Sequence, residues 1–271
     1  MEIVPGVHRI EGVRGSNVVL LVDEQMAVVD TGVRDNGETI VKYIKSIGRS
    51  PRDLRWILLS HFHFDHSGSA SELADLTGAK IVTHKDEVER QPDGTMLLRK
   101  GNEGEPPPLW YRIARRMPAR RDTRVYPDIV VDETMDDGDV IPCMGGLHII
   151  HTPGHTAGSI CPVLEGPDKV LFLGDSVLNN VDRLSRPLMW DRRNRRALDA
   201  SLRKLRELEA DAACFGHGPP LTAEVMTKIR GLTDRPYDLP TWRIVLKNWR
   251  TLKRFAESSR GEGNWSGGTP S

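Results

Sequence analysis

The stretch Ser60-His61-Phe62-His63-Phe64-Asp65-His66-Ser67-Gly68 places three imidazoles and one carboxylate within six residues. It directly follows the apolar run 56–59, which predicts a strand. Histidine nitrogens and carboxylate oxygens are common ligands of transition-metal ions. The stretch therefore predicts a metal-binding loop at the end of a strand. The alternative is a solvated polar loop with a chance excess of histidine, and that alternative explains none of the other motifs.

Three further motifs place a histidine or a carboxylate beside glycine, each next to an expected strand. They are His151-Thr152-Pro153-Gly154-His155-Thr156-Ala157-Gly158-Ser159, Gly174-Asp175 and Phe215-Gly216-His217-Gly218-Pro219. Glycine lets the backbone turn sharply and approach closely. Loops at the carboxyl ends of strands converge in layered α/β folds. Each motif is a weak signal alone, but together the four segments predict one shared site.

The four motifs together resemble those of the metallo-β-lactamase superfamily, and they come in the family's order. The separations also fit: 89 residues from His66 to His155, 20 from there to Asp175 and 42 from there to His217. Val28-Val29-Asp30-Thr31-Gly32 is similar to the family's first motif. The resemblance covers about residues 5–220. It implies an α/β fold, an αββα sandwich of two mixed β-sheets with outer helices and the metals at one edge.

By this resemblance, seven side chains hold two divalent metal ions. Zinc is the expected metal, and iron and manganese are the alternatives. The first-site ligands are His61, His63 and His155, the second-site ligands are Asp65, His66 and His217, and Asp175 bridges both ions. Asp65 and Asp175 are also the candidate catalytic residues, whereas Asp30 braces the histidine loop without binding metal. Two ions about 3.5–4 Å apart would hold between them the hydroxide that attacks the substrate.

The family hosts many reactions, so departures from its patterns narrow the function. His66 in place of an arginine, with no cysteine at the second site, differs from the commonest zinc β-lactamases. HxHxDH disfavours the flavodiiron branch, and a full second site disfavours the persulfide dioxygenases. Leu178, three residues after Asp175, stands where acyl-homoserine lactonases often carry tyrosine, which disfavours a quorum-signal lactonase.

The compact hydrolases of the glyoxalase-II-like and lactonase-like branches remain. The resemblance therefore predicts hydrolysis of an acyl bond in a small molecule, namely a thioester, a lactone or another ester. The runner-up is a small-molecule phosphodiesterase or a β-lactamase-like amidase on the same metal site. A non-catalytic binding protein is the third interpretation, and the complete ligand set disfavours it.

Composition narrows the partners and the compartment. The 271 residues include 38 basic and 38 acidic ones, so the formal net charge is zero, which disfavours nucleic-acid or anionic-membrane binding. The run 18–22 is far shorter than a membrane span, and the N-terminus lacks a secretory pattern. Three cysteines without CxxC predict no disulfide framework. We expect a cytoplasmic protein with a small-molecule substrate, no nucleic-acid or membrane partner, and a possible oligomer.

A single domain is expected over residues 1–258, followed by a disordered tail at 259–271. An insertion at about 91–127 is predicted to act as a lid that shapes substrate choice or as a dimer contact. C-terminal helices are expected at about 222–258. Before them, the hydrophobic pattern predicts a hairpin over 17–30 and helices over 36–47, 69–76 and 196–210.

Some remaining polar residues receive structural interpretations. His151 is expected to make a structural hydrogen bond rather than to bind metal, and His84 is expected to be solvated, with a place in the cleft wall as the alternative. The arginine-rich runs 112–124 and 183–196 are interpreted as solvated faces, and the alternative is that one of their arginines holds a substrate carboxylate or phosphate. The three thiols are expected to be buried small hydrophobes, namely Cys143, Cys161 and Cys214.

Overall fold

The computed structural model describes residues 1–100, 128–181 and 183–234. Its larger sheet has seven strands in the order β1-β2-β3-β4-β5-β6-β9. Each of the strands β1 to β4 runs antiparallel to its neighbour in this group, and β4, β5, β6 and β9 are parallel. The strands are β1 (Glu2–Val4), β2 (Val7–Arg9), β3 (Val19–Leu21), β4 (Met26–Val29), β5 (Leu54–Leu58), β6 (Lys80–His84) and β9 (Glu133–Met135).

The second sheet has five strands in the order β10-β11-β12-β13-β16. Its pairs are antiparallel except β13 with β16, which are parallel. The strands are β10 (Val140–Ile141), β11 (Leu147–His148), β12 (Val163–Leu164), β13 (Val170–Phe172) and β16 (Ala212–Cys214). Two separate hairpins pair β7 (Val88–Arg90) with β8 (Met96–Leu98), and β14 (Leu178–Asn179) with β15 (Leu184–Ser185).

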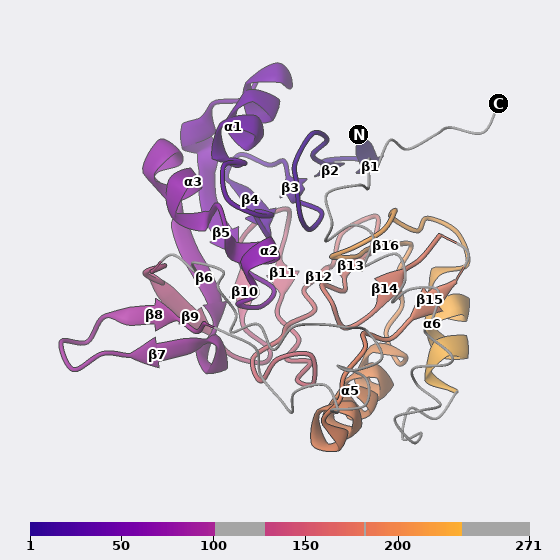
Figure 1. The fold of residues 1–271 in the computed structure, drawn as a ribbon. Coiled ribbons are helices and arrows are strands. Elements are labelled where there is room, and N and C mark those ends of the chain that lie inside the picture. The colour runs from indigo at the N-terminus through magenta and orange to yellow at the C-terminus, as the bar shows by residue number, and fades with distance from the viewer. Residues whose placement is uncertain (101–127, 182, 235–271) are drawn as a thin grey trace, which may run out of the picture.

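Helices cover the outer faces of the two sheets. Figure 1 shows α1 and α3 beside the seven-stranded sheet, and α5 and α6 beside the five-stranded one. The α-helices are α1 (Gly37–Ser46), α2 (Phe64–Ser67), α3 (Ala70–Thr77), α5 (Arg192–Leu205) and α6 (Val225–Thr233). Two 3-10 turns, η1 (Pro51–Asp53) and η2 (Lys85–Glu87), precede β5 and β7. Among the described residues, no helix is long and apolar enough to cross a membrane.

Side-chain alternation along the strands builds the layers. In β3, Leu20 packs in the cluster that α1 and α3 cover, whereas Val19 and Leu21 pack between the two sheets. In β13, Phe172 faces between the sheets and Leu171 faces the cluster that includes α5. Because successive residues of a strand point to opposite faces, each central strand contributes to two cores. The result is the predicted αββα sandwich.

The helix expected over 196–210 is α5, which spans Arg192–Leu205. Helix α5 begins at Arg192 instead of residue 196, because the side chain of Asp191 caps it by accepting a 2.6 Å hydrogen bond from the backbone N–H of Arg193. The run 183–196 is not wholly solvated: Arg186 and Arg195 are buried, and Arg186 pairs with Asp199 at 3.1 Å.

Several expectations fall partly or wholly outside the described residues. Of the insertion, residues 91–100 are described and contribute strand β8, while 101–127 lie outside. The C-terminal helical region is described only as far as residue 234, so its remainder and the tail 259–271 also lie outside.

Candidate metal centre

The first metal group consists of His61, His63 and His155, from two loops at one edge of the sandwich. Nδ1 of His63 lies 3.0 Å from Nε2 of His61 and 2.9 Å from Nε2 of His155. Tetrahedral zinc with nitrogen ligands holds neighbouring ligand atoms about 3.3 Å apart. The first metal group therefore has a spacing close to that of three ligands of one ion.

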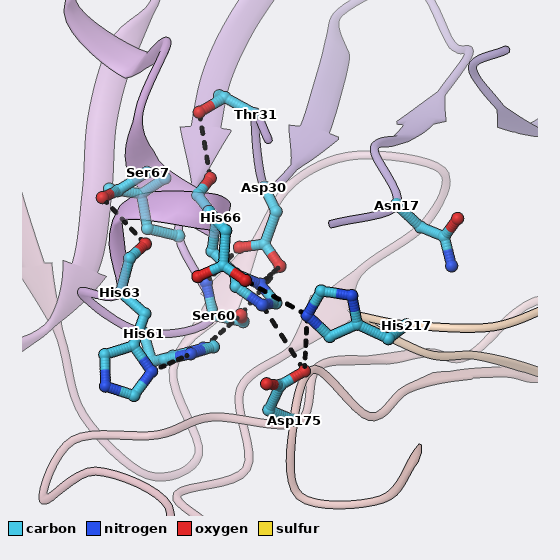
Figure 2. A network of polar contacts seen from close by, with 12 residues as sticks. Asn17, Asp30, Thr31, Ser60, His61, His63, His66, Ser67, Asp175 and His217 are labelled. Atoms are coloured by element: carbon cyan, nitrogen blue, oxygen red, sulfur yellow. Dashed lines mark hydrogen bonds and ion pairs between the residues drawn. The ribbon is translucent and has the colours of Figure 1, made fainter. Parts of the chain in front are cut away.

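The second metal group consists of Asp65, His66 and His217. Its ligand atoms all lie within 4.8 Å of one another, and Nε2 of His217 lies 3.3 Å from Oδ2 of Asp65. Asp65 and His66 come from the short helix α2, whereas His217 follows β16. Figure 2 shows the imidazole of His217 approaching the histidine loop from the opposite sheet.

Asp175 lies between the two groups. Its Oδ2 is 3.5 Å from Nε2 of His155, in the first metal group. Its Oδ1 is 3.4 Å from Nε2 of His66 and 3.7 Å from Nε2 of His217, in the second metal group. One carboxylate thus presents a different oxygen to each group, as a bridging ligand would.

Two of these buried atoms lack a hydrogen bond, and this tests whether the residues fit a cation. Nε2 of His66 and Oδ1 of Asp175 are both buried and have no hydrogen-bond partner. Buried polar atoms are normally satisfied, so each such atom needs an explanation. A cation between the groups would satisfy both, and the all-nitrogen-and-oxygen donor set suits zinc, iron or manganese.

Asp30 holds the histidine loop through hydrogen bonds. Its Oδ1 accepts a 2.8 Å hydrogen bond from the backbone N–H of Ser60, and its Oδ2 accepts one of 2.8 Å from the Ser60 hydroxyl. Oδ2 also lies 2.7 Å from Nδ1 of His66 (Figure 2). Asp30 itself has a backbone φ of 60°, an uncommon conformation for a residue with a side chain. Such strain at the end of β4 is typical of functional sites.

The loop that carries His217 is held by Asn17, a residue that the sequence analysis did not single out. The Asn17 amide donates to the carbonyls of Phe215 at 2.9 Å and Gly218 at 2.6 Å. Its backbone N–H donates to the carbonyl of Gly216 at 2.7 Å. A polar residue just before β3 gives no sequence signal for this role, because its partners are about 200 residues away.

Gly216 lets this loop approach the centre. A Cβ at this position would lie 2.4 Å from Oδ1 of Asp175 and 2.6 Å from Cε1 of His66. Real Cβ atoms essentially never come so close. The GHGP-type motif therefore needs glycine before His217 because Asp175 and His66 occupy the space of a side chain.

Electrostatics distinguish the two groups. Burial lowers the pKa of all three histidines of the first metal group. The pKa of His61 falls well below its usual value, that of His63 falls to about 3, and that of His155 is also lowered. Burial also opposes the charged form of His66 and His217, but Asp30 and Asp175 raise the pKa of His66 well above its usual value, and Asp175 raises that of His217. Without a cation, the first group is neutral and the second tends to hold protons.

Exposure is uneven across the centre. His61 and His66 are fully or nearly fully buried, whereas the side chains of Asp65 and His217 are 28% and 26% exposed. Each group therefore combines one buried histidine with two partly exposed ligands.

His84 and His151 form a separate pair. His84 is fully buried, so its expected solvation is wrong: its ring stacks on that of His151 at 3.9 Å with planes 14° apart. The ring nitrogen Nε2 of His151 lies 2.8 Å from the carbonyl of Ala157, as a structural hydrogen bond requires. Nearly parallel rings do not aim their in-plane lone pairs at one point, so we assign no metal ion to this pair.

Comparison with known proteins identifies the family of this chain. The family model described as "Metallo-beta-lactamase superfamily" matches residues 12–217. The chain belongs to this superfamily. The resemblance inferred from the sequence and the predicted fold are therefore confirmed. As in any superfamily with many chemistries, membership shows the fold and a metal-dependent hydrolase class more firmly than it shows a substrate.

Individual relatives are distant. The chain is 25% identical to the probable metallo-hydrolase YflN of Bacillus subtilis over 214 residues, 73% of this chain and 76% of that protein. It is 34% identical to the acyl-coenzyme A thioesterase MBLAC2 of Bos taurus over 57% of this chain and 55% of that one. It is 28% identical to a hydroxyacylglutathione hydrolase of Rhodospirillum rubrum over 70% of this chain and 56% of that one. The chain thus spans little more than half of the last two.

Solved structures support the fold. The metallo-beta-lactamase family protein TTHA1429 of Thermus thermophilus superposes with a TM-score of 0.62 at 24% identity, covering 86% of this chain and 79% of that one. The metallo-beta-lactamase SMB-1 superposes with a TM-score of 0.60 at 18% identity, covering 97% and 85%. At such identities the likeness shows the shared fold alone.

Proposed function

We propose that this superfamily member is a binuclear metal-dependent hydrolase that cleaves an acyl bond of a small molecule, as in a thioester, a lactone or another ester. One observation carries the proposal: the two oxygens of Asp175 face different ligand groups, Oδ2 toward His155 and Oδ1 toward His66 and His217. A carboxylate so placed, with three further ligands on each side, suits a pair of divalent ions.

In this proposal, His61, His63 and His155 hold one ion, Asp65, His66 and His217 hold the other, and Asp175 contacts both. Zinc fits this donor set, with iron or manganese as alternatives. When bound, such a pair activates water as a nucleophile at neutral pH and polarises the oxygen of the scissile bond.

The remaining work falls to the chain's own side chains. Oδ2 of Asp30 accepts a hydrogen bond from Nδ1–H of His66, which leaves Nε2, on the side of Asp175, as the ring nitrogen that would bind the cation. The side chain of Asp65 is partly exposed, and its Oδ2 lies 3.3 Å from Nε2 of His217. We assign Asp65 the role of ligand and acceptor of the proton that the attacking water loses.

The acyl class is supported by what similar proteins are called. They include an acyl-coenzyme A thioesterase, an N-acyl homoserine lactonase and hydroxyacylglutathione hydrolases. An acyl group is common to all three names. Leu178, buried just after the Gly174-Asp175 loop, stands where acyl-homoserine lactonases often carry tyrosine. Because leucine has no hydroxyl group, we place thioesters ahead of acyl-homoserine lactones.

A hydrolysis panel tests the proposal. The purified protein, reloaded with Zn²⁺, is assayed against short-chain acyl thioesters, lactones, a phosphodiester and a β-lactam, with metal-depleted protein as the blank. We expect the highest kcat/KM on an acyl thioester or ester, and a loss of about 100-fold or more in Asp175→Asn. The control is Asp75→Asn, because Asp75 is exposed on α3. A phosphodiester or β-lactam as the best substrate would contradict the acyl assignment.

A further inference from the structure

Glu87 is a fully buried carboxylate at the end of the turn η2, outside every motif that the sequence analysis singled out. Its Oε2 accepts a 2.6 Å hydrogen bond from the backbone N–H of Phe62. Its Oε1 accepts hydrogen bonds from the Thr156 hydroxyl at 2.7 Å and from the backbone N–H of Gly158 at 2.6 Å. Burying a carboxylate is costly unless several donors compensate it, and these three do so.

These contacts join two loops that lie more than 90 residues apart in sequence. Phe62 lies between His61 and His63, and Thr156 directly follows His155. The three histidines of the first metal group thus all lie on the two segments that this one carboxylate connects. The side chain of Ser159 extends the connection, because its hydroxyl lies 2.7 Å from that of Thr156.

The second loop is shaped for this approach. A Cβ at Gly158 would lie 2.7 Å from both Cγ and Oε1 of Glu87. The backbone therefore reaches the carboxylate only because residue 158 has no side chain. The second glycine of the HTPGHTxGS-type turn is therefore required because Glu87 occupies the space of a side chain, as Asp175 does at Gly216.

We propose that Glu87 is a positioning residue that sets the affinity and geometry of the first metal group without touching the ion. The inference rests on the proposed function, since it presupposes cations at the two groups. Asp30 contacts the second metal group directly at His66 and reaches His61 of the first group only through the Ser60 hydroxyl. Phe62, Thr156 and Gly158, which donate to the Glu87 carboxylate, all lie on the two segments that carry the first group, so losing that carboxylate should affect the first site far more than the second.

Glu87→Gln tests this with almost no change in shape. An amide keeps one acceptor oxygen and places an NH₂ donor against at least one of the three donors. If the NH₂ takes the Oε2 position, it faces the backbone N–H of Phe62, whose nitrogen lies 2.6 Å from Oε2 in the wild type. The resulting repulsion moves the segment between His61 and His63. Glu89→Gln is the matched control, because Glu89 is exposed on the adjacent strand β7.

The measurement is titration of metal-depleted protein with Co²⁺ against a competing chelator, followed by the visible absorption bands of the bound ion. We expect Glu87→Gln to weaken one of two Co²⁺ sites by about 10- to 100-fold, with shifted bands, while the other site keeps its affinity. Glu89→Gln should match the wild type. Wild-type affinity and spectra in Glu87→Gln, or equal weakening of both sites, would overturn the inference.

A second pair of variants applies if Glu87→Gln does not fold. Thr156→Ser keeps the hydroxyl that contacts Glu87, and Thr156→Val removes it. We expect the serine variant to retain the wild-type Co²⁺ spectrum and the valine variant to weaken the same single site; identical behaviour of the two would overturn the inference. Failure of the proposed function is distinguishable, because the wild type would then bind fewer than two Co²⁺ ions.

Discussion

Oδ2 of Asp30 lies 2.7 Å from Nδ1 of His66, and both side chains are buried. The contact fixes the ring so that Nε2 points toward Asp175, 3.4 Å away. A metal-binding histidine normally donates its other ring N–H to a carboxylate or carbonyl, which sets its tautomer and orientation. Asp30, in the segment Asp30-Thr31-Gly32 after β4, thus acts on the second metal group through His66.

Asp30→Asn should weaken the second metal group. An amide has only one acceptor oxygen, so its NH₂ must face either the Ser60 N–H or the Ser60 hydroxyl and Nδ1 of His66. Because His66 is the ligand that Asp30 contacts directly, we expect about a 10- to 100-fold loss of Zn²⁺ affinity, largest at the second site. Competition with a chelator measures it. Asp35→Asn is a close control, because Asp35 shares the left-handed backbone, with a φ of 66°, and its side chain is 87% exposed. Equal affinities in the two variants would contradict this role.

Gly216→Ala should disrupt the centre even though it alters no ligand. The added Cβ would meet Oδ1 of Asp175 at 2.4 Å, so either the bridge or the His217 loop must move. We expect metal content to fall from two equivalents to one or less, as read by elemental analysis. The control is Gly231→Ala in α6, where a Cβ meets nothing within 4 Å. Normal metal content in Gly216→Ala would show that the His217 loop can move to accommodate the methyl group without loss of metal, and would contradict this prediction.

The sequence predicted the ligand loops better than their supports. HxHxDH and the three glycine-flanked motifs are local patterns, and each marks the end of a strand, so their convergence followed from the α/β arrangement. Asn17 and Glu87 were missed because their partners are distant in sequence. The exposure of His84 was predicted wrongly because a histidine at the end of an expected strand is usually solvated. In the structure, His84 is buried and its ring stacks on that of His151.

Acidification should remove metal from the second group first. In metal-free protein, the carboxylates Asp30 and Asp175 raise the pKa of His66 against burial, so a binding cation must displace a proton there. Burial lowers the pKa of His61, and that of His63 to about 3, so the first group is already deprotonated near neutral pH. As pH falls from about 8 toward about 5.5, affinity should fall more steeply at the second group.

The measurement is Zn²⁺ content after equilibrium dialysis at stepped pH. We expect a plateau near one equivalent before the last ion leaves. Simultaneous loss of both ions, or a first group that empties earlier, would contradict the separate protonation of the two groups.

The three cysteines should resist alkylation in the folded protein. All are buried, and burial raises the pKa of Cys143 and Cys214 to about 12 and that of Cys161 to about 11. Only the thiolate reacts, and at pH 8 it is roughly one part in a thousand or less at such pKa values. A thiol reagent should therefore label none rapidly in native protein and three after denaturation. Rapid labelling of the native protein would contradict their burial.

The central claim is that seven side chains hold two ions bridged by Asp175. Its most direct test is elemental analysis of wild type and Asp175→Asn after loading with excess Zn²⁺ and removal of loosely bound metal. The account predicts close to two equivalents of zinc per chain in the wild type and about one or fewer in the variant, because one carboxylate faces both groups. One equivalent in the metal-replete wild type, or two in the variant, would contradict it.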